Sequence, residues 1–186
     1  MKLTIINLES DLSVLIQVLT ITLVFICVSS CRSRFEPKVW SSDERIIDGA
    51  ELLTRQEIDS LFVMINDLSI NLGPQIGVVT TDSLSGVDER TFCLQNAEDM
   101  QLGRSSYADG IIIFISVKDG ATGIMSGKGL VQVLPSEKLK WIDQVLLKPR
   151  VKEKEYFEGL NDAISFLKRE LEEKKELIGK FPNDQQ

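Results

Sequence analysis

The sequence predicts a single α/β domain with a layered structure built around a small central mixed sheet. Residues 111–115 are five consecutive apolar residues, which is typical of a strand covered on both faces. Residues 54–72 and 152–171 instead carry apolar side chains at steps of three and four, the spacing of a helix with one buried face. About 150 residues follow the apolar N-terminal stretch, enough for one domain with a sizeable core.

The first half of the domain is expected to contain two helices and two strands. Thr54 and Glu57 have the spacing of a capping box at a helix start, and Pro74 prevents this helix from continuing. Residues 75–81 are short and β-branched, which predicts a strand. Residues 87–102 carry one apolar stripe at helical spacing and are expected to form the second helix before the central strand.

The second half is expected to begin with a hairpin and to end in two helices. The dipeptide Asp119-Gly120 favours a turn, after which residues 121–126 would pair with the central strand. Ser136 is a candidate cap for a helix that Pro149 limits, with Trp141 in the core, and the last helix is expected to begin near Lys152.

The N-terminus has the pattern of an export signal. The run from Leu12 to Val28 has no charged residue, and Val28-Ser29-Ser30-Cys31 resembles the lipobox of bacterial lipoproteins, in which the cysteine receives a lipid and becomes the mature N-terminus. Residues 1–31 are therefore expected to be a lipoprotein signal peptide with Cys31 as the lipidation site. The alternatives are an uncleaved transmembrane anchor, favoured by Arg32 and Arg34 beyond the run, and an ordinary cleaved signal.

These patterns give the expected organisation of the chain. Residues 32–45 have mixed charge and read as a flexible tether, residues 46–178 as the folded domain, and residues 179–186 as a disordered tail. The protein is expected in the bacterial cell envelope, on the periplasmic or extracellular side, with the membrane as a partner through its lipid anchor.

The composition excludes several classes of function. The chain has a formal net charge of −7 and no concentrated basic stripe, which disfavours a nucleic-acid partner. It contains no histidine, so Ser-His-Asp and Cys-His catalysis within one chain are excluded. Cys93 has no basic neighbour positioned to lower its pKa, and a buried inert thiol is the favoured interpretation.

The order and spacing of several short segments resemble the TPM domain family, over about residues 45–170. The segments are IDGAELL (47–53), GPQIGVVTTDSL (73–84), LG (102–103) leading to DGIIIF (109–114), GKGL (127–130), LKP (147–149) and YF (156–157). The resemblance implies a three-layer α/β/α sandwich of Rossmann-like appearance, usually exported or tethered to a membrane. For some members it also implies bound calcium or another divalent metal and acid phosphatase activity. The chain departs from the family where relatives commonly have basic residues, at Gly120-Ala121-Thr122, and where an asparagine is often seen, at Asp109.

Four acidic residues lie at the ends of the expected strands or in the loops beside them: Asp48, Asp82, Asp109 and Asp119. Hard cations prefer oxygen ligands, so calcium, or less favourably magnesium, is the expected metal if these carboxylates converge. Turn chemistry is the slightly favoured explanation of these residues, because aspartate is a good turn former. The segment Ser126–Leu130 is glycine-rich but lacks the dinucleotide and P-loop patterns, so no nucleotide cofactor is expected.

Three functional hypotheses follow. The favoured one is a membrane-anchored, non-catalytic module that binds, assembles or maintains membrane complexes, with a structural divalent ion as an option. The alternative is a metal-dependent acid phosphatase-like hydrolase, in which a carboxylate-bound cation polarises a phosphoryl oxygen. The third is a transport or secretion accessory whose partner binds the domain directly.

Overall fold

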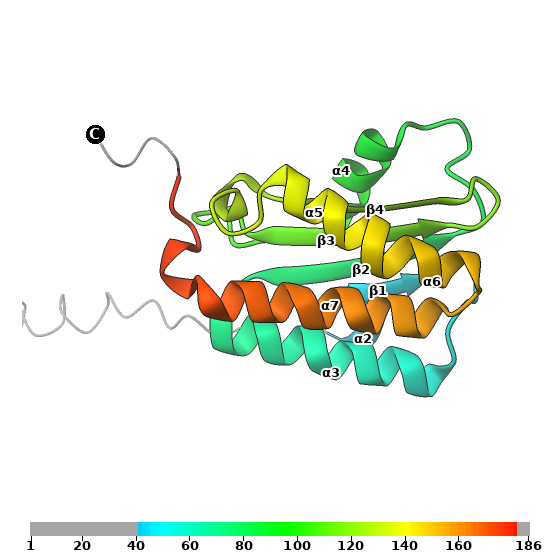
Figure 1. Ribbon diagram of the computed structural model, residues 1–186, viewed down its shortest axis with the longest axis horizontal. Coiled ribbons are helices and arrows are strands. Elements are labelled where there is room, and N and C mark those ends of the chain that lie inside the picture. Colours follow the sequence, from blue (N-terminus) through cyan, green and yellow to red (C-terminus); the bar gives the residue numbers. More distant parts are fainter. Residues whose placement is uncertain (1–40, 182–186) are drawn as a thin grey trace, which may run out of the picture. The chain divides into compact units, whose positions relative to one another are not determined.

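A four-stranded sheet lies at the centre of the computed structural model, which describes residues 41–181 (Figure 1). The strands are β1 (Ile46–Asp48), β2 (Gln75–Thr81), β3 (Gly110–Ser116) and β4 (Ala121–Ser126). They lie side by side in that order, with β1, β2 and β3 parallel and β4 antiparallel to β3. The predicted small mixed sheet is therefore confirmed, and β1, which was not predicted, is its short edge strand.

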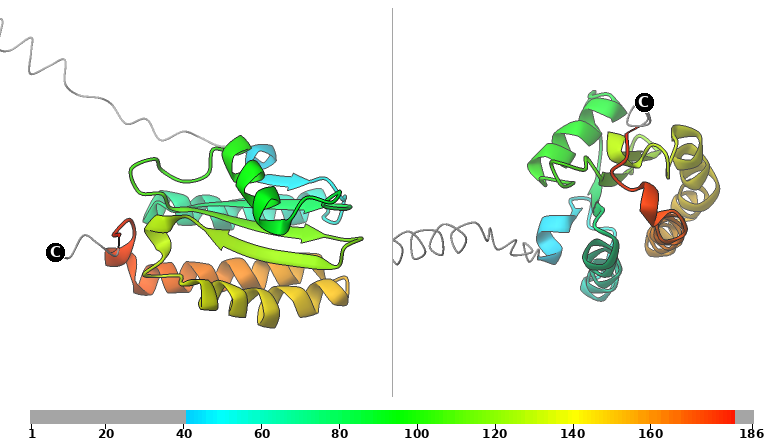
Figure 2. Two further views of the ribbon diagram at one scale, coloured as in Figure 1. Left: turned by 90° about the horizontal axis from the view of Figure 1, so that it is seen from above. Right: turned by 90° about the vertical axis from the view of Figure 1, so that its left-hand side faces the viewer.

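Helices cover both faces of this sheet. They are α2 (Ser42–Arg45), α3 (Arg55–Leu72), α4 (Glu89–Asp99), α5 (Ser136–Ile142), α6 (Lys148–Lys152) and α7 (Tyr156–Glu173), with single turns at η1 (Lys128–Leu130), η2 (Asp143–Leu147) and η3 (Lys175–Leu177). One face is covered by α4, and the other by α3, α7 and the α5–α6 segment (Figure 2). Within residues 41–181, no helix combines the length and the apolar character that crossing a bilayer requires.

The two helical layers enclose two cores of different size, which explains the continuous apolar run of β3. Val78 and Ile113 belong to the larger core under α3, α5 and α7, whereas Val79 and Phe114 belong to the smaller core under α4. Successive side chains of a strand point to opposite faces, so a strand between two cores must be apolar at every position. The predicted three-layer arrangement is confirmed.

The folded unit extends beyond both predicted boundaries. Residues 42–45, expected to end the tether, form α2, and Arg45 is buried with Nη2 donating to Oε1 of Gln75 at 3.1 Å. At the other end, the amide of Gly179 donates to the carbonyl of Gly129 at 2.8 Å. Gly179, the first residue of the expected tail, is thus hydrogen-bonded to the domain. The rest of the expected tether, residues 32–40, and of the expected tail, residues 182–186, lie outside the described residues.

The segment before α7 differs from the prediction because Pro149 does not end a helix. A π-helical turn, η2, lies between α5 and α6 and shifts the hydrogen-bonding pattern of the backbone. Pro149 therefore falls in the first turn of α6, where the N–H group that proline lacks costs little stability. The last helix consequently begins at Tyr156 and not near Lys152. Trp141 was expected in the core but is 45% exposed, with its ring 5.1 Å from that of Phe166.

Candidate functional site

Three of the four carboxylates predicted as metal ligands lie at one edge of the sheet. Asp48 is the last residue of β1, Asp82 follows β2, and Asp119 lies in the turn after β3. Because these strands are parallel and in register, their carboxyl ends meet at the same edge, which we call the carboxyl edge. Asp109 immediately precedes β3 and therefore lies at the opposite end of the sheet.

The Asp48 carboxylate holds the loop that leads from β1 into α3. Its two oxygens accept hydrogen bonds from the amides of Leu52 and Leu53, at 3.1 and 2.9 Å, and the hydroxyl of Thr80 also donates to it. A carboxylate that accepts several backbone N–H groups closes a turn in the manner of a cap. Asp48 has a structural role in this arrangement.

Asp119 serves the hairpin between β3 and β4 in a similar way. It accepts a hydrogen bond from the Ser116 hydroxyl at 2.6 Å and one from the Leu84 amide at 2.7 Å. The Ser116 hydrogen bond, followed by that of the Leu84 amide, lowers the pKa of the Asp119 carboxyl, because both donors favour its charged form. Asp119 thereby connects two loops of the carboxyl edge.

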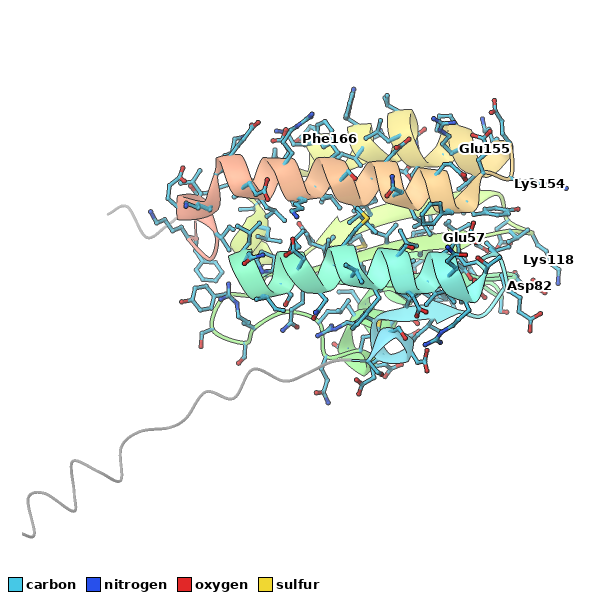
Figure 3. The ribbon with its side chains drawn as sticks, turned by 90° about the horizontal axis from the view of Figure 1, so that it is seen from below. Glu57, Asp82, Lys118, Lys154, Glu155 and Phe166 are labelled. Carbon is cyan, nitrogen blue, oxygen red and sulfur yellow. The ribbon has the colours of Figure 1, made fainter. Side chains whose placement is uncertain are left out.

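Asp82 makes an exposed ion pair at the same edge. Its carboxylate lies 2.7 Å from Nζ of Lys118, and both side chains are more than half exposed, at 63% and 68% (Figure 3). Exposed pairs of this kind contribute at most about 1 kcal/mol to stability. Of the three carboxylates at this edge, Asp82 is therefore the least constrained.

Asp109 is buried completely in an ion pair with Arg104. One carboxylate oxygen accepts from the Arg104 amide at 2.7 Å, and the other lies 2.8 Å from Nε and 2.5 Å from Nη2 of the same residue. The guanidinium also lies over the ring of Tyr107, 4.0 Å from its centroid. Asp109 thus fixes the loop before β3 and does not join the other three carboxylates.

The glycine-rich segment after β4 packs against that same loop. The amides of Gly127 and Gly129 donate to the carbonyls of Gly110 and Ala108, at 2.8 and 3.0 Å. A Cβ atom on Gly129 would lie only 1.6 Å from the carbonyl oxygen of Tyr107. These glycines therefore permit close backbone approach, and their amides are used within the protein and not for an anion.

Cys93 is a residue of α4, and its side chain is buried in the smaller core, as the sequence indicated. Its side chain is 1% exposed, and burial, together with the nearby Glu89 carboxylate, raises the pKa of the thiol to about 12. The thiol is consequently neutral at physiological pH and inert as a nucleophile.

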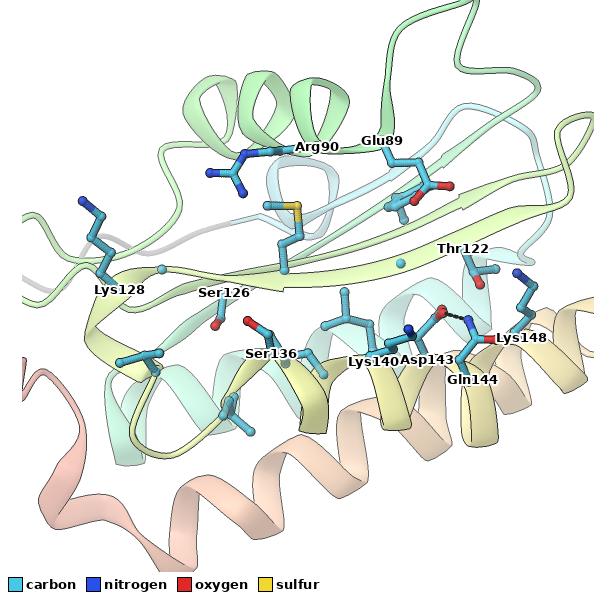
Figure 4. Close-up of a pocket in the computed structure, with 18 residues that line it drawn as sticks. Glu89, Arg90, Thr122, Ser126, Lys128, Ser136, Lys140, Asp143, Gln144 and Lys148 are labelled. Carbon is cyan, nitrogen blue, oxygen red and sulfur yellow. Dashed lines mark hydrogen bonds between the residues drawn. The ribbon is translucent and has the colours of Figure 1, made fainter. Parts of the chain in front are cut away.

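A cleft of about 590 Å³ follows the open edge of the sheet along β4 (Figure 4). Its floor consists of the consecutive residues 122–127, one wall is the first turn of α4, and the other is the segment from α5 to α6. The sequence analysis did not identify this cleft. The only signal was the spacing of four between Ser136, Lys140, Gln144 and Lys148, which marks one polar helix face without showing what it faces.

Cationic side chains outnumber anionic ones around this cleft. The lining residues with a positive charge are Arg90, Lys128, Lys140 and Lys148, and those with a carboxyl group are Glu89 and Asp143. The whole chain has a net charge of −7, so the local balance is opposite to the overall one. The cleft therefore favours an anionic occupant.

Two buried polar atoms in the cleft wall lack a well-formed hydrogen bond within the described part of the chain: Thr122 Oγ1 and Asp143 Oδ1. The other Asp143 oxygen accepts a hydrogen bond from the side-chain amide nitrogen of Gln144 at 2.6 Å (Figure 4). Burial raises the pKa of the Asp143 carboxyl, against the opposing effects of Thr122, Gln144 and Lys148. The Thr122 hydroxyl is close enough to act on the Asp143 carboxyl, and both of these atoms are shielded from the solvent in the cleft.

The sequence profile of the TPM domain matches residues 46–170, about two thirds of the chain. The chain belongs to the TPM domain family. The predicted resemblance is thus confirmed, and the match begins at the first residue of β1 and ends within α7. No curated protein matches the chain.

The solved structures that are similar to this TPM domain include three from bacteria. The N-terminal domain of a P. gingivalis protein has a TM-score of 0.65 and 20% identity, with 76% of this chain and 94% of that one covered. The BA42 protein of Bizionia argentinensis has a TM-score of 0.57 and 22% identity, with 72% of this chain and 93% of that one covered. The N-terminal domain of a Corynebacterium glutamicum protein has a TM-score of 0.57 and 15% identity, with 73% of this chain and 83% of that one covered. At these identities the similarity establishes the fold.

The four predicted ligands of this TPM domain do not form a ready-made calcium cage. Calcium takes six to eight oxygen ligands around one point, whereas Asp109 lies at the far end of the sheet and Asp48 and Asp119 already accept hydrogen bonds from their own loops. Within residues 41–181, no three acidic or cysteine side chains lie close enough together to hold a metal ion. Calcium binding itself stays a prediction.

Replacing Asp48 by Ala distinguishes a turn from a metal ligand. We expect the free energy of unfolding to fall by about 1–3 kcal/mol, because the Leu52 and Leu53 amides lose their acceptor. The loss should be the same in EDTA and in millimolar calcium, measured by urea unfolding. Asp82→Ala is the matched control and should change stability by less than about 1 kcal/mol. A loss confined to the calcium samples would instead identify Asp48 as a ligand.

Proposed function

We propose that this TPM protein is a lipid-anchored, non-catalytic binding module of the bacterial cell envelope, which helps to assemble or maintain membrane complexes. The observation that carries the proposal is the cleft along β4, which joins an open strand edge and four cationic side chains. Clefts of several hundred cubic ångströms with a few convergent polar groups are the usual form of binding sites.

The anchor is supported by the sequence. Cys31 and the apolar run before it lie outside the described residues, so the lipobox pattern Val28-Ser29-Ser30-Cys31 is the support for lipidation. The proposal places the protein on the periplasmic or extracellular side of a membrane, with the folded domain following the anchor. A multiply acylated cysteine holds a protein durably at a bilayer.

The chemistry of the domain favours binding over catalysis. The chain has no histidine, the Cys93 thiol is buried and neutral, and the carboxylates of the carboxyl edge are each engaged by donors of their own loops or by Lys118. A general base or nucleophile needs a free reactive group within reach of a substrate. A metal-dependent acid phosphatase-like reaction is therefore the less favoured function.

Replacing Cys31 by Ser tests the anchor. We expect the variant to lose incorporation of radiolabelled palmitate, because the serine hydroxyl does not accept the lipid. Cys93→Ser is the matched control and should keep the label. A Cys31→Ser protein that is still labelled would contradict Cys31 as the lipidation site.

The binding part of the proposal is tested with the same anchored protein in native membranes. A photo-crosslinking amino acid at position 140, in the cleft, should give discrete crosslinked species, whereas the same group at position 175, exposed on η3, should not. Equal crosslinking at both positions, or none at position 140, would contradict a binding role for the cleft.

A further inference from the structure

The side of β4 that faces away from β3 has unpaired backbone groups. In an antiparallel ladder, alternate residues exchange hydrogen bonds with the partner strand while the residues between them point outward. The Gly127 amide donates to the Gly110 carbonyl, so the register places the odd-numbered residues of β4 in the ladder. The backbone N–H and C=O groups of Thr122, Ile124 and Ser126 therefore point outward, where no further strand follows in the described sheet.

The cleft lies along this open edge. The six residues 122–127 contribute its floor, about 20 Å of extended chain at the usual rise of a strand. The walls on either side come from α4 on one face of the sheet and α5, η2 and α6 on the other (Figure 4). A slot of this form matches the cross-section of one more strand, which would receive main-chain hydrogen bonds from β4.

The positions of the cations identify the chemistry of the occupant. Lys128 and Lys148 lie toward opposite ends of the cleft, with Arg90 and Lys140 between them on the two walls (Figure 4). A single compact anion would need cations that converge on one point, whereas this distribution suits negative charges repeated along an extended chain.

We infer that the cleft binds an acidic, extended peptide segment of a partner protein, which adds to the sheet as a fifth strand beside β4. This inference rests on the proposed binding function and specifies its ligand. Backbone pairing with Thr122, Ile124 and Ser126 holds the segment beside β4, and the cations of the two walls select for its acidic side chains.

The test uses the full-length protein in detergent and a fluorescein-labelled nonapeptide in which Glu and Val alternate around a central Thr. We expect fluorescence anisotropy to show saturable binding of this peptide and at least about tenfold weaker binding of its Glu→Gln counterpart, because the charges are complementary. Peptide binding to the Lys140→Glu/Lys148→Glu double variant should be weakened to a similar degree. Binding to Lys175→Glu, the matched surface control, should change less than about twofold. Circular dichroism melting verifies that the variants are folded.

Two N-methylated peptides separate strand addition from simple charge attraction. One carries methyl groups on the amides of its odd residues and the other on its even residues, so only one of them blocks the N–H groups that face β4. We expect one methylated peptide to lose binding and the other to keep it. Equal affinity of the two, complete competition by millimolar inorganic phosphate, or binding by a second copy of the chain in place of the peptide would overturn the inference. Absence of peptide binding alongside crosslinking at position 140 would overturn the inference and leave the proposed function standing.

Discussion

Ile113→Asp is expected to prevent the domain from folding. Ile113 is fully buried in the middle of β3, between parallel β2 and antiparallel β4, and its side chain belongs to the larger core. The substitution would place a carboxylate there without a partner and would remove the apolar contacts of the isoleucine. A cost above about 4–5 kcal/mol is a large fraction of the 5–15 kcal/mol that stabilises a typical domain.

The measurement is the soluble yield together with the cooperative unfolding transition followed by circular dichroism. Ile47→Asp is the matched control, because it makes the same chemical change on edge strand β1, where the isoleucine is 40% exposed. This control should fold with a near-native melting curve. A soluble Ile113→Asp protein that melts like the parent would contradict the position of β3 at the centre of two cores.

Asp109→Ala is expected to lower the free energy of unfolding by about 3–5 kcal/mol, the typical cost of breaking a buried ion pair from one side. The change removes three hydrogen bonds to Arg104, two from its side chain and one from its amide. The Arg104 side chain is only 29% exposed, so part of its desolvation cost remains uncompensated when its partner is removed.

Urea unfolding of Asp109→Ala and Asp82→Ala side by side provides the comparison. Both substitutions break one ion pair, but the Asp82–Lys118 pair is mostly exposed and its loss should cost less than about 1 kcal/mol. Equal costs for the two variants would show that burial of Asp109 does not determine its contribution.

Most of the architecture was predictable, because β2, β3, β4 and the long helices each carry their own local pattern, whereas the three-residue strand β1 does not. The capping box of Thr54 and Glu57 is present, and the apolar run of β3 lies where its composition required, between two layers. The π-helical turn was not predictable, because the wider turn depends on how η2 packs against β4 and α7, and Pro149 alone predicts a helix end.

The candidate site was harder to predict than the fold. Asp48, Asp82 and Asp119 lie at or after the ends of strands, but such a position does not indicate whether the carboxylate faces an open site or accepts hydrogen bonds from nearby amides. Asp109 was grouped with them although it precedes β3 and therefore lies at the other end of the sheet. The cleft could not be predicted, since its walls come from α4 and from α5–α6, which are distant in sequence and approach each other only across β4.

The open edge of β4 also has a consequence for the protein at high concentration. An uncovered strand can pair with the same strand of another copy, and many proteins avoid such aggregation by placing lysines beside their edges. Two copies of this chain meeting edge to edge would bring Lys128, Lys140 and Lys148 of each against their counterparts. The cations that would attract an acidic partner therefore repel self-association, and because salt screens charges over about 8–10 Å at moderate ionic strength, this protection weakens as the salt concentration rises.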